Sequence, residues 1–361
     1  MSGTGRGGVV TTDGKGRTGP PLRVAVVGCG LIGRRRAEVV RRAGRDDVVI
    51  VVDGNEPRAE QLAREIGCLA TADWQAAIGR EEVDVVIVAT THDWLAPISI
   101  AALRQGKHVL VEKPMARNPT EAEMVVRAAV QGQRVLGVGF NHRYHPAIWE
   151  AHELLAQGAI GEPFSIRCRY GHGGRPGYEK EWRMVPEVAG GGELLDQGIH
   201  AVDLFRWFLG DLAEAFGFTA TYVWGNRPTA VHNTLEDNGF ALFRTATGQV
   251  ASLHASWTQW KNLFSFEVTG RDGYLIVEGL GGSYGPERLT WGRRRPESGA
   301  PDEEHFDYPA ADRSWEAEWL EFVAAIREER APLADGHAGW QAVRAVFALY
   351  ESARSGRVVR L

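Results

Sequence analysis

The feature that most constrains this chain is a glycine pattern that stands between an apolar run and a helical pattern. In "LRVAVVGCGLIG", β-branched residues lead into Gly28, Gly30 and Gly33, which fit G-x-G-x-x-G. The first glycine permits a tight turn, the second lets a pyrophosphate approach the backbone, and the third allows close packing of helix on strand. Free N–H groups at the helix N-terminus, beside Leu31 and Ile32, would bind the pyrophosphate. The pattern predicts a dinucleotide site; a purely structural strand-to-helix turn is the alternative.

An acidic residue follows at the position that such a site requires. Asp53 ends the next apolar run, "VVIVVD", and its carboxylate would accept hydrogen bonds from the adenosine ribose hydroxyls. Because its charge would repel a 2′-phosphate, NAD is the predicted cofactor. Six arginines follow the glycine loop and Arg58 lies just beyond Asp53, so NADP stays open as the alternative.

Further apolar runs alternate with helical patterns along the first part of the chain. "DVVIVVDG", "VDVVIVAT", "KHVLVEKP" and "QRVLGVGF" are hydrophobic throughout, which is typical of strands buried on both faces of a parallel sheet. Strands that alternate with helices indicate βαβ units and a doubly wound α/β fold. We therefore expect a disordered tail over residues 1–20 and a Rossmann domain over residues 21–142. Thr90, at the end of "VVIVAT", is a further expected cofactor contact.

The pattern changes after residue 142. Runs such as "EAFGFTATYVW", "NGFALFRTATG" and "LFSFEVTG" include several that alternate in polarity, and Gly-containing turns separate them, which favours antiparallel pairing. Residues 143–361 are therefore expected to form an α+β domain on a large, mainly antiparallel, open-faced sheet. Its many aromatic residues favour a homo-oligomer, a dimer or a tetramer, that uses the open face. A face covered by the chain's own helices is the alternative.

Composition narrows the class of protein. A length of 361 residues favours two domains, and 44% hydrophobic with 24% charged residues is typical of a soluble globular chain. The net charge is −5 and no basic stripe dominates, so nucleic acid is not expected as a partner. No apolar stretch is long enough to span a bilayer, so no membrane partner is expected. The three cysteines are too scattered for a disulfide framework, and we expect a cytoplasmic protein with reduced thiols.

Two short segments carry candidate catalytic side chains. "HVLVEKPMA" places Glu112 and Lys113 at the carboxyl end of a parallel strand, where ligands bind in such folds. In "GGGELLDQGIH", Asp196 and His200 are four positions apart and would share one helix face. The three glycines before them would let the backbone pass close to substrate. An ordinary surface helix pair is the alternative, and no further ligands at zinc-type spacing accompany the pair, so no metal is expected.

The order of these motifs resembles that of the Gfo/Idh/MocA oxidoreductases, which include glucose–fructose oxidoreductase and inositol dehydrogenases. The resemblance rests on "GCGLIG", "VVD", "GKHVLVEKP", "GFNHRYHP", "GAIGEP" and "GGGELLDQGIHAVDLFRWFLG", from Leu22 to the last helix. It implies NAD or NADP in the first domain, a sugar or cyclitol against the second sheet, and catalysis by Lys113, Asp196 and His200. Glu112 is expected at the cofactor. Four positions, Thr91, His92, Ala96 and Arg36, depart from the usual family pattern.

The residues suggest a division of labour for oxidising a secondary alcohol. His200 suits the proton acceptor because imidazole titrates near neutral pH. Asp196 would orient its ring or bind a neighbouring hydroxyl, and Lys113 would hydrogen-bond the reacting oxygen. The sequence leaves open whether Lys113 or His200 takes the proton.

A long polar loop, "YGHGGRPGYEKEWRMVPEVA", precedes the glycines. It offers side chains that would cover the site, and "NHRY" offers three more; a solvated loop is the alternative. The candidate substrate contacts are His142, Arg143, Tyr144, Trp182 and Arg183, with Arg175, Tyr178 and Lys180 nearby. The predicted function is an NAD(P)-dependent dehydrogenase or ketoreductase of a sugar, nucleotide sugar or cyclitol. The alternatives are an NAD-dependent glycoside hydrolase or eliminase that oxidises transiently, and a non-catalytic NAD-binding regulator.

Overall fold

The glycine pattern connects strand β1 (Arg23–Val27) to helix α1 (Leu31–Ala43), as the sequence predicts. The computed structural model describes residues 19–224 and 235–361, so residues 1–18 of the predicted tail lie outside the described residues. Strand β1 is central in a six-stranded sheet of order β3-β2-β1-β4-β5-β6, in which every neighbouring pair is parallel. The other elements of this unit are β2 (Asp47–Val52), α2 (Glu56–Ile66), β3 (Leu69–Thr71), α3 (Trp74–Ile78), β4 (Val85–Val88), α4 (His92–Arg104), β5 (His108–Val111), α5 (Pro119–Gly132) and β6 (Leu136–Val138).

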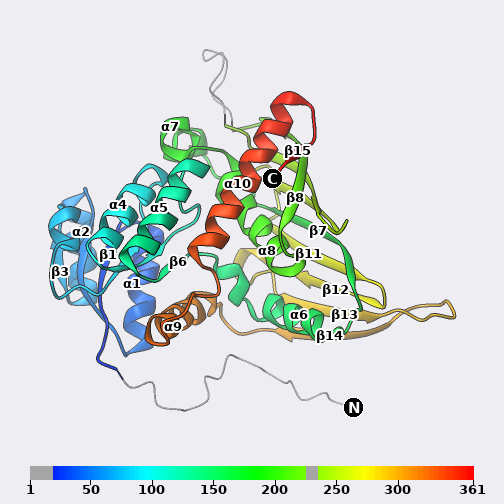
Figure 1. Cartoon of the computed structure of the whole chain (residues 1–361), viewed down its shortest axis with the longest axis horizontal. Helices are drawn as coiled ribbons and strands as arrows, with labels where there is room; N and C mark the ends of the chain where they lie inside the picture. The colour runs from blue at the N-terminus through cyan, green and yellow to red at the C-terminus, as the bar shows by residue number, and fades with distance from the viewer. Residues whose placement is uncertain (1–18, 225–234) are drawn as a thin grey trace.

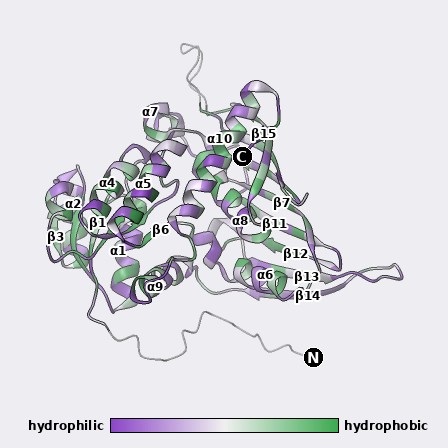
Figure 2. Ribbon diagram, viewed as in Figure 1, coloured by the Kyte–Doolittle hydropathy of each residue, from purple (hydrophilic) through white to green (hydrophobic). Residues whose placement is uncertain are grey.

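The doubly wound fold follows from strands that are apolar on both faces. All four residues of β4 are buried, and so are the last three of β5. Figure 2 shows the surface helices striped with hydrophobic and hydrophilic residues, as helices that cover a sheet require. The strand order reverses between β1 and β4, so ligands are expected beyond the carboxyl ends of these strands. Gly28, Thr90 and Lys113 all follow such strand ends.

The second unit is built on a nine-stranded sheet of order β14-β13-β12-β11-β7-β10-β9-β8-β15. Only the β7–β10 pair is parallel among the pairs described, which confirms the mainly antiparallel sheet predicted from the sequence. Its strands are β7 (Pro163–Gly171), β8 (Leu212–Ala220), β9 (Asn238–Thr245), β10 (Val250–Ser256), β11 (Leu263–Gly270), β12 (Gly273–Glu278), β13 (Glu287–Arg293), β14 (Asp302–Tyr308) and β15 (Val359–Arg360).

One face of this sheet carries helices and the other retains exposed apolar residues. Helix α6 (Pro146–Ala156) packs on β12 to β14, and α8 (Ile199–Leu209) packs on β7. The opposite face of the sheet is exposed over strands β7 to β10. The exposed apolar residues of β7 to β10 are Phe164, Phe218, Phe240, Leu242 and Val250. Within the described ranges, no helix combines the length and apolarity needed to cross a membrane.

The last two helices, within the residues 143–361 that the sequence assigns to the second domain, contact the first unit as well. Helix α9 (Ser314–Arg327) packs against α1, and α10 (Gly336–Ser355) lies between the two units against α5 and β8 (Figure 1). Trp319 and Phe322 of α9 are fully buried in a cluster with Val24 and Leu62 of the first unit. The C-terminal helices therefore join the two units through a shared apolar core.

We predict that Trp319→Ala destabilises the protein by about 3–5 kcal/mol, because the truncation leaves a large cavity between α9 and the first sheet. The free energy of unfolding from urea titration measures this. Trp260→Ala serves as the control, because Trp260 is 70% exposed, and its cost should stay within about 0.5 kcal/mol. Equal losses in the two variants would contradict the assigned role of α9.

Candidate active site

The glycine loop is shaped by close contacts within the chain. Gly28 has a φ of +99°, and a Cβ atom there would lie 2.3 Å from the carbonyl oxygen of Ala89. A Cβ atom on Gly33 would lie 1.6 Å from the carbonyl oxygen of Gly28. A Cβ atom on Gly30 would meet nothing within 4 Å. Gly28 and Gly33 thus secure the turn, and Gly30 leaves open space above it.

The start of helix α1 fits a dinucleotide pyrophosphate. Its N-cap residue, Gly30, provides no side-chain cap, and the first helical turn contains no acidic residue. Leu31 is 77% exposed beside this space. Unpaired N–H groups and the helix dipole attract an anion to such a position. Gly30, Leu31 and Ile32 would hold the pyrophosphate.

Asp53 extends this site along the sheet edge. Its carboxylate accepts hydrogen bonds from the backbone N–H of Cys29 at 2.9 Å and of Asn55 at 2.9 Å. Arg58 lies 3.3 Å from the same carboxylate and is half exposed. The hydrogen bond from Cys29 holds the negative charge of Asp53 beside the glycine loop. A carboxylate in this position could accept hydrogen bonds from ribose hydroxyls. Thr90, predicted at the cofactor, follows β4 next to Gly28.

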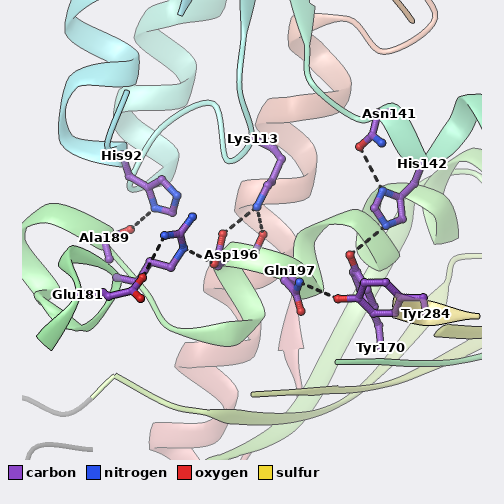
Figure 3. Close-up of polar contacts among 11 residues, drawn as sticks. His92, Lys113, Asn141, His142, Tyr170, Glu181, Ala189, Asp196, Gln197 and Tyr284 are labelled. Atoms are coloured by element: carbon purple, nitrogen blue, oxygen red, sulfur yellow. Dashed lines mark hydrogen bonds and ion pairs between the residues drawn. The ribbon is translucent and has the colours of Figure 1, made fainter. Parts of the chain in front are cut away.

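The central interaction of the crevice is an ion pair between the two units (Figure 3). Lys113, directly after β5, donates to Oδ1 of Asp196 at 2.7 Å and to the Asp196 backbone oxygen at 2.5 Å. Arg183 donates to Oδ2 of Asp196 at 3.0 Å. Burial acts to raise the pKa of Asp196, but Lys113 and Arg183 outweigh it and hold that pKa well below its usual range. Asp196 is therefore a carboxylate with both oxygens engaged.

The structure corrects the expectation that Asp196 orients the His200 ring. Residues Leu194–Gly198 form a π-helical turn, and α8 begins only at Ile199. The two oxygens of Asp196 bond to Lys113 and Arg183, while Nδ1 of His200 is buried without a hydrogen-bond partner. The cations attract the carboxylate away from the imidazole. The four-residue spacing brought both side chains to the crevice but did not pair them.

His200 is held by aromatic contacts. Its ring stacks on the His142 ring with centroids 3.9 Å apart, and Phe140 meets its edge. Burial, reinforced by the nearby charge of Lys113, lowers the pKa of His200 well below its usual value. His200 is therefore neutral at physiological pH.

Three of the predicted substrate contacts lie behind the site. His142 is buried beneath His200, and its ring nitrogens lie 3.3 Å from Asn141 Oδ1 and 3.2 Å from the Tyr170 hydroxyl. Arg143 forms a buried pair with Asp203, with Nε 2.7 Å from Oδ2. The remaining member, Tyr144, is buried and donates to Glu321 at 3.1 Å. All three are buried and bonded to other interior side chains, so they support the site and do not line it.

Glu112 also turns away from the crevice, against the prediction that it contacts the cofactor. It is buried, and Oε1 accepts from Nε of Arg36 at 2.7 Å. Arg36 also pairs with Glu318 of α9. Arg36, which stands at a position where the family pattern differs, thus connects helix α1, the end of β5 and helix α9. Glu112 fixes the backbone that carries Lys113.

The polar loop predicted to cover the site reaches it through two residues. Besides pairing with Asp196, Arg183 lies over the Trp182 ring at 4.5 Å. Trp182 in turn meets His92, whose Nδ1 is 2.8 Å from the carbonyl oxygen of Ala189. Burial lowers the pKa of His92 to about 4. Of the other loop residues, Arg175 pairs with Glu181, Tyr178 is buried against Trp224 and Trp257, and Lys180 is exposed.

The three glycines make room for the protein itself. A Cβ atom on Gly191 would lie 2.4 Å from the Tyr350 hydroxyl, and one on Gly192 would lie 2.1 Å from the Glu236 carbonyl oxygen. The expectation that these glycines admit substrate is thus replaced by a packing requirement. Because Gly191 and Gly192 lack side chains, the π-turn packs closely against α10 and against the segment that leads into β9.

Sequence reasoning missed four residues of the crevice: His92, Tyr170, Gln197 and Tyr284. Gln197 Nε2 donates to the Tyr284 hydroxyl at 3.3 Å, and the Tyr170 and Tyr284 rings are 5.6 Å apart (Figure 3). Gln197 lies within "GGGELLDQGIH", so the sequence motif could have pointed to it. His92 begins α4, Tyr170 lies in β7 and Tyr284 lies in a short helix, and no motif links these three positions. Among the described residues, no group of three His, Cys, Asp or Glu side chains could hold a metal ion.

Comparisons with known proteins agree with this geometry. Residues 22–140 match "Oxidoreductase family, NAD-binding Rossmann fold", and residues 148–276 match the "GFO/IDH/MocA C-terminal domain". The chain belongs to the Gfo/Idh/MocA family. It is an oxidoreductase whose first domain binds NAD, and the resemblance inferred from the motifs is confirmed.

Several relatives are similar over much of the chain. Levoglucosan dehydrogenase of Pseudarthrobacter phenanthrenivorans is 28% identical over a segment that covers 63% of this chain and 64% of that protein. The 1,5-anhydro-D-fructose reductase of Ensifer adhaerens is 28% identical over 94% of this chain and 98% of its own. A solved levoglucosan dehydrogenase in complex with NADH and levoglucosan superposes with a TM-score of 0.85 at 23% identity, over 94% of this chain and 99% of that one. This likeness establishes the shared fold.

We predict opposite outcomes for two glycine substitutions in the loop. Gly33→Ala should lower the stability, because its Cβ atom collides with the Gly28 backbone. Gly30→Ala should leave the melting temperature unchanged, since its Cβ atom meets no protein atom, yet weaken NADH binding where the pyrophosphate approaches. Thermal unfolding and fluorescence titration with NADH measure the two effects. A stable Gly33→Ala protein with unchanged affinity would contradict this account of the loop.

The charge of Asp53 gives a separate prediction. Asp53→Asn should weaken NADH binding by roughly 10- to 100-fold, because charge-assisted hydrogen bonds to the ribose are lost. It should also reduce the preference for NADH over NADPH, measured by titration with both. Asp47→Asn, an exposed residue at the other end of β2, is the control. An unchanged ratio of the two affinities in Asp53→Asn would show that Asp53 does not select the cofactor.

Proposed function

We propose that this protein transfers hydride between NAD and a secondary alcohol or ketone of a sugar, a nucleotide sugar or a cyclitol. The observation that carries the proposal is the buried Lys113–Asp196 pair, set beyond the carboxyl end of β5 with His200 in the same crevice. Two relatives whose names specify anhydrosugars support a carbohydrate-like substrate. We further infer a cytoplasmic location, in keeping with three free cysteines.

In this mechanism, the bound nicotinamide supplies the hydride chemistry. Lys113 carries three N–H donors, of which two are used by Asp196, so the third is available for the oxygen of the reacting carbon. Asp196 holds the ammonium in place. Neutral His200 takes the hydroxyl proton during oxidation and returns it during reduction.

Substrate orientation is assigned to the crevice side chains that remain partly exposed. Arg183 lies over the Trp182 ring, and Gln197 donates to the Tyr284 hydroxyl. All four side chains are partly exposed. Gln197 and Tyr284 are seen together in Figure 3. Hydroxyl-rich ligands suit this set, because amide, phenol and guanidinium groups offer fixed donors and acceptors. Trp182 would stack on an apolar face of the ring and keep water from the reacting carbon.

We also propose a homo-oligomer, a dimer or tetramer, that covers the open face of the nine-stranded sheet. Phe218 is 59% exposed there, and Leu242 is 49% exposed on the neighbouring strand β9. A broad apolar face of this kind is unusual on a monomer. The assembly would bury it.

We predict that Lys113→Met and His200→Asn each lower kcat by roughly 10²- to 10⁴-fold, because each removes a group that acts on the reacting oxygen or its proton. NADH affinity should stay within a few-fold. Absorbance at the NADH band, with sugars, nucleotide sugars and cyclitols as substrates, measures turnover. His337→Asn, an exposed histidine on α10, is the control and should keep full activity.

Three results would overturn the proposal. Wild-type turnover in both variants would exclude Lys113 and His200 from the chemistry. A cleaved glycoside with no net change in NAD would instead indicate a hydrolase or eliminase. A protein that binds NADH yet turns over no member of the panel would indicate a regulator.

A further inference from the structure

A buried glutamate lies directly beneath the catalytic pair and has no assigned role. Glu193 follows the three glycines, three residues before Asp196, and its exposed fraction is 0%. Neither Oε1 nor Oε2 has a hydrogen-bond partner. A carboxylate left without donors in the interior is strongly unfavourable.

The donors near Glu193 are used by other groups. Glu236 accepts from the backbone N–H of Gly192 at 3.1 Å and of Leu194 at 3.0 Å, and from the Tyr350 hydroxyl at 2.7 Å. Lys113 donates to Asp196. Two neighbouring acids thus take these donors, and the backbone N–H of Ser256 favours the charged form of Glu193 only weakly against burial.

The surrounding charges also disfavour ionisation. The ionisable groups that act on or near Glu193 are Asp196, Lys113, Glu236, Tyr170, Tyr178 and Tyr284. Lys113 is the cation among these groups, and it is paired. Burial first, and then Asp196, raise the pKa of Glu193 well above its ordinary value, against the smaller opposing effect of Lys113.

A second unpartnered acceptor lies one turn further along. Gln197 Oε1 is buried without a hydrogen bond, while its Nε2 is committed to Tyr284. Glu193 immediately precedes the π-helical turn Leu194–Gly198, which contains Gln197. A proton on Glu193 would convert one of the three unpartnered oxygens into a donor and satisfy two of them.

We propose that Glu193 is an uncharged, proton-bearing carboxyl group that donates to Gln197 Oε1 and so acts as a positioning residue beneath the Lys113–Asp196 pair. Its neutrality leaves Asp196 as the sole negative partner of Lys113. Its hydrogen bond fixes Gln197 toward Tyr284 and the substrate. The effect on turnover rests on the proposed function; the protonation state does not.

Glu193→Gln tests the proposal, because glutamine is uncharged and keeps a donor. At pH 7 the wild-type minus variant difference spectrum should show the infrared carbonyl band of a protonated acid, shifted by ¹³C-glutamate labelling. Burial raises the pKa of Glu236 and of Glu318 to about 7, and their bands cancel in this difference. Stability gives a second readout. Wild-type folding must keep a proton on Glu193 at any pH above its unfolded pKa, so wild-type stability falls as pH rises above about 4.5. The variant should therefore melt higher than wild type at pH 8, by about 2–4 °C or more, with the difference shrinking at pH 5.

Turnover supplies the third readout. Glu193→Gln should keep kcat within about threefold at pH 7 and retain it at alkaline pH, where wild-type activity falls as Glu193 ionises beside Asp196. Glu193→Leu, which has no donor, should raise KM and lower kcat at every pH. Glu187→Gln, on the exposed side of α7 (Pro186–Ala189), is the control and should change nothing.

The proposal is overturned if the difference spectrum between wild type and Glu193→Gln at pH 7 lacks the protonated-acid band, or if the stability difference does not depend on pH. It is also overturned if Glu193→Leu and Glu193→Gln turn over alike. Should no substrate be found, the infrared and melting results still decide the state of Glu193, while the proposed dehydrogenase function fails separately.

Discussion

The active site depends on one ion pair between two separately built units. Lys113 stands at the end of a buried parallel strand, and Asp196 stands in a π-turn that leads into α8. Removing both charges from water is costly, and the cost is offset only when each charged atom has partners in good geometry. The second contact from Lys113 to the Asp196 backbone, and the Arg183 bond to its other oxygen, meet that requirement. The positions of the surrounding side chains follow from this pair.

The scaffold keeps the pair in place from both sides. On the first unit, Arg36 binds Glu112 and Glu318, so the strand end is tied to α1 and to α9. On the second unit, the glycines bring the π-turn against Glu236 and α10. Helix α9 packs on α1, and α10 packs on both α5 and β8. A crevice closed by buried charges and shared helices suits chemistry that must exclude water.

Sequence reasoning succeeded where local physics decides the outcome. The glycine loop, the fully apolar strands and the antiparallel second sheet all follow from patterns within a few residues, and the structure confirms them. It failed where a side chain had a choice of distant partners. Asp196 was expected beside His200 and instead binds Lys113 and Arg183; Arg143 was expected in the pocket and instead pairs with Asp203. Nothing in the spacing of residues ranks such competing partners.

The sequence by itself determined the architecture and the glycine turn between β1 and α1, because backbone conformation and burial are encoded locally. The resemblance of its motifs to a known family singled out Lys113, Asp196 and His200. Only the tertiary structure decided which charges meet. It turned Glu112 inward to Arg36, placed His142 beneath His200, and left Glu193 buried without a donor. The physical reason is that a charge in a low-dielectric interior bonds to whichever partner the packing brings within reach. That partner comes from a distant part of the chain.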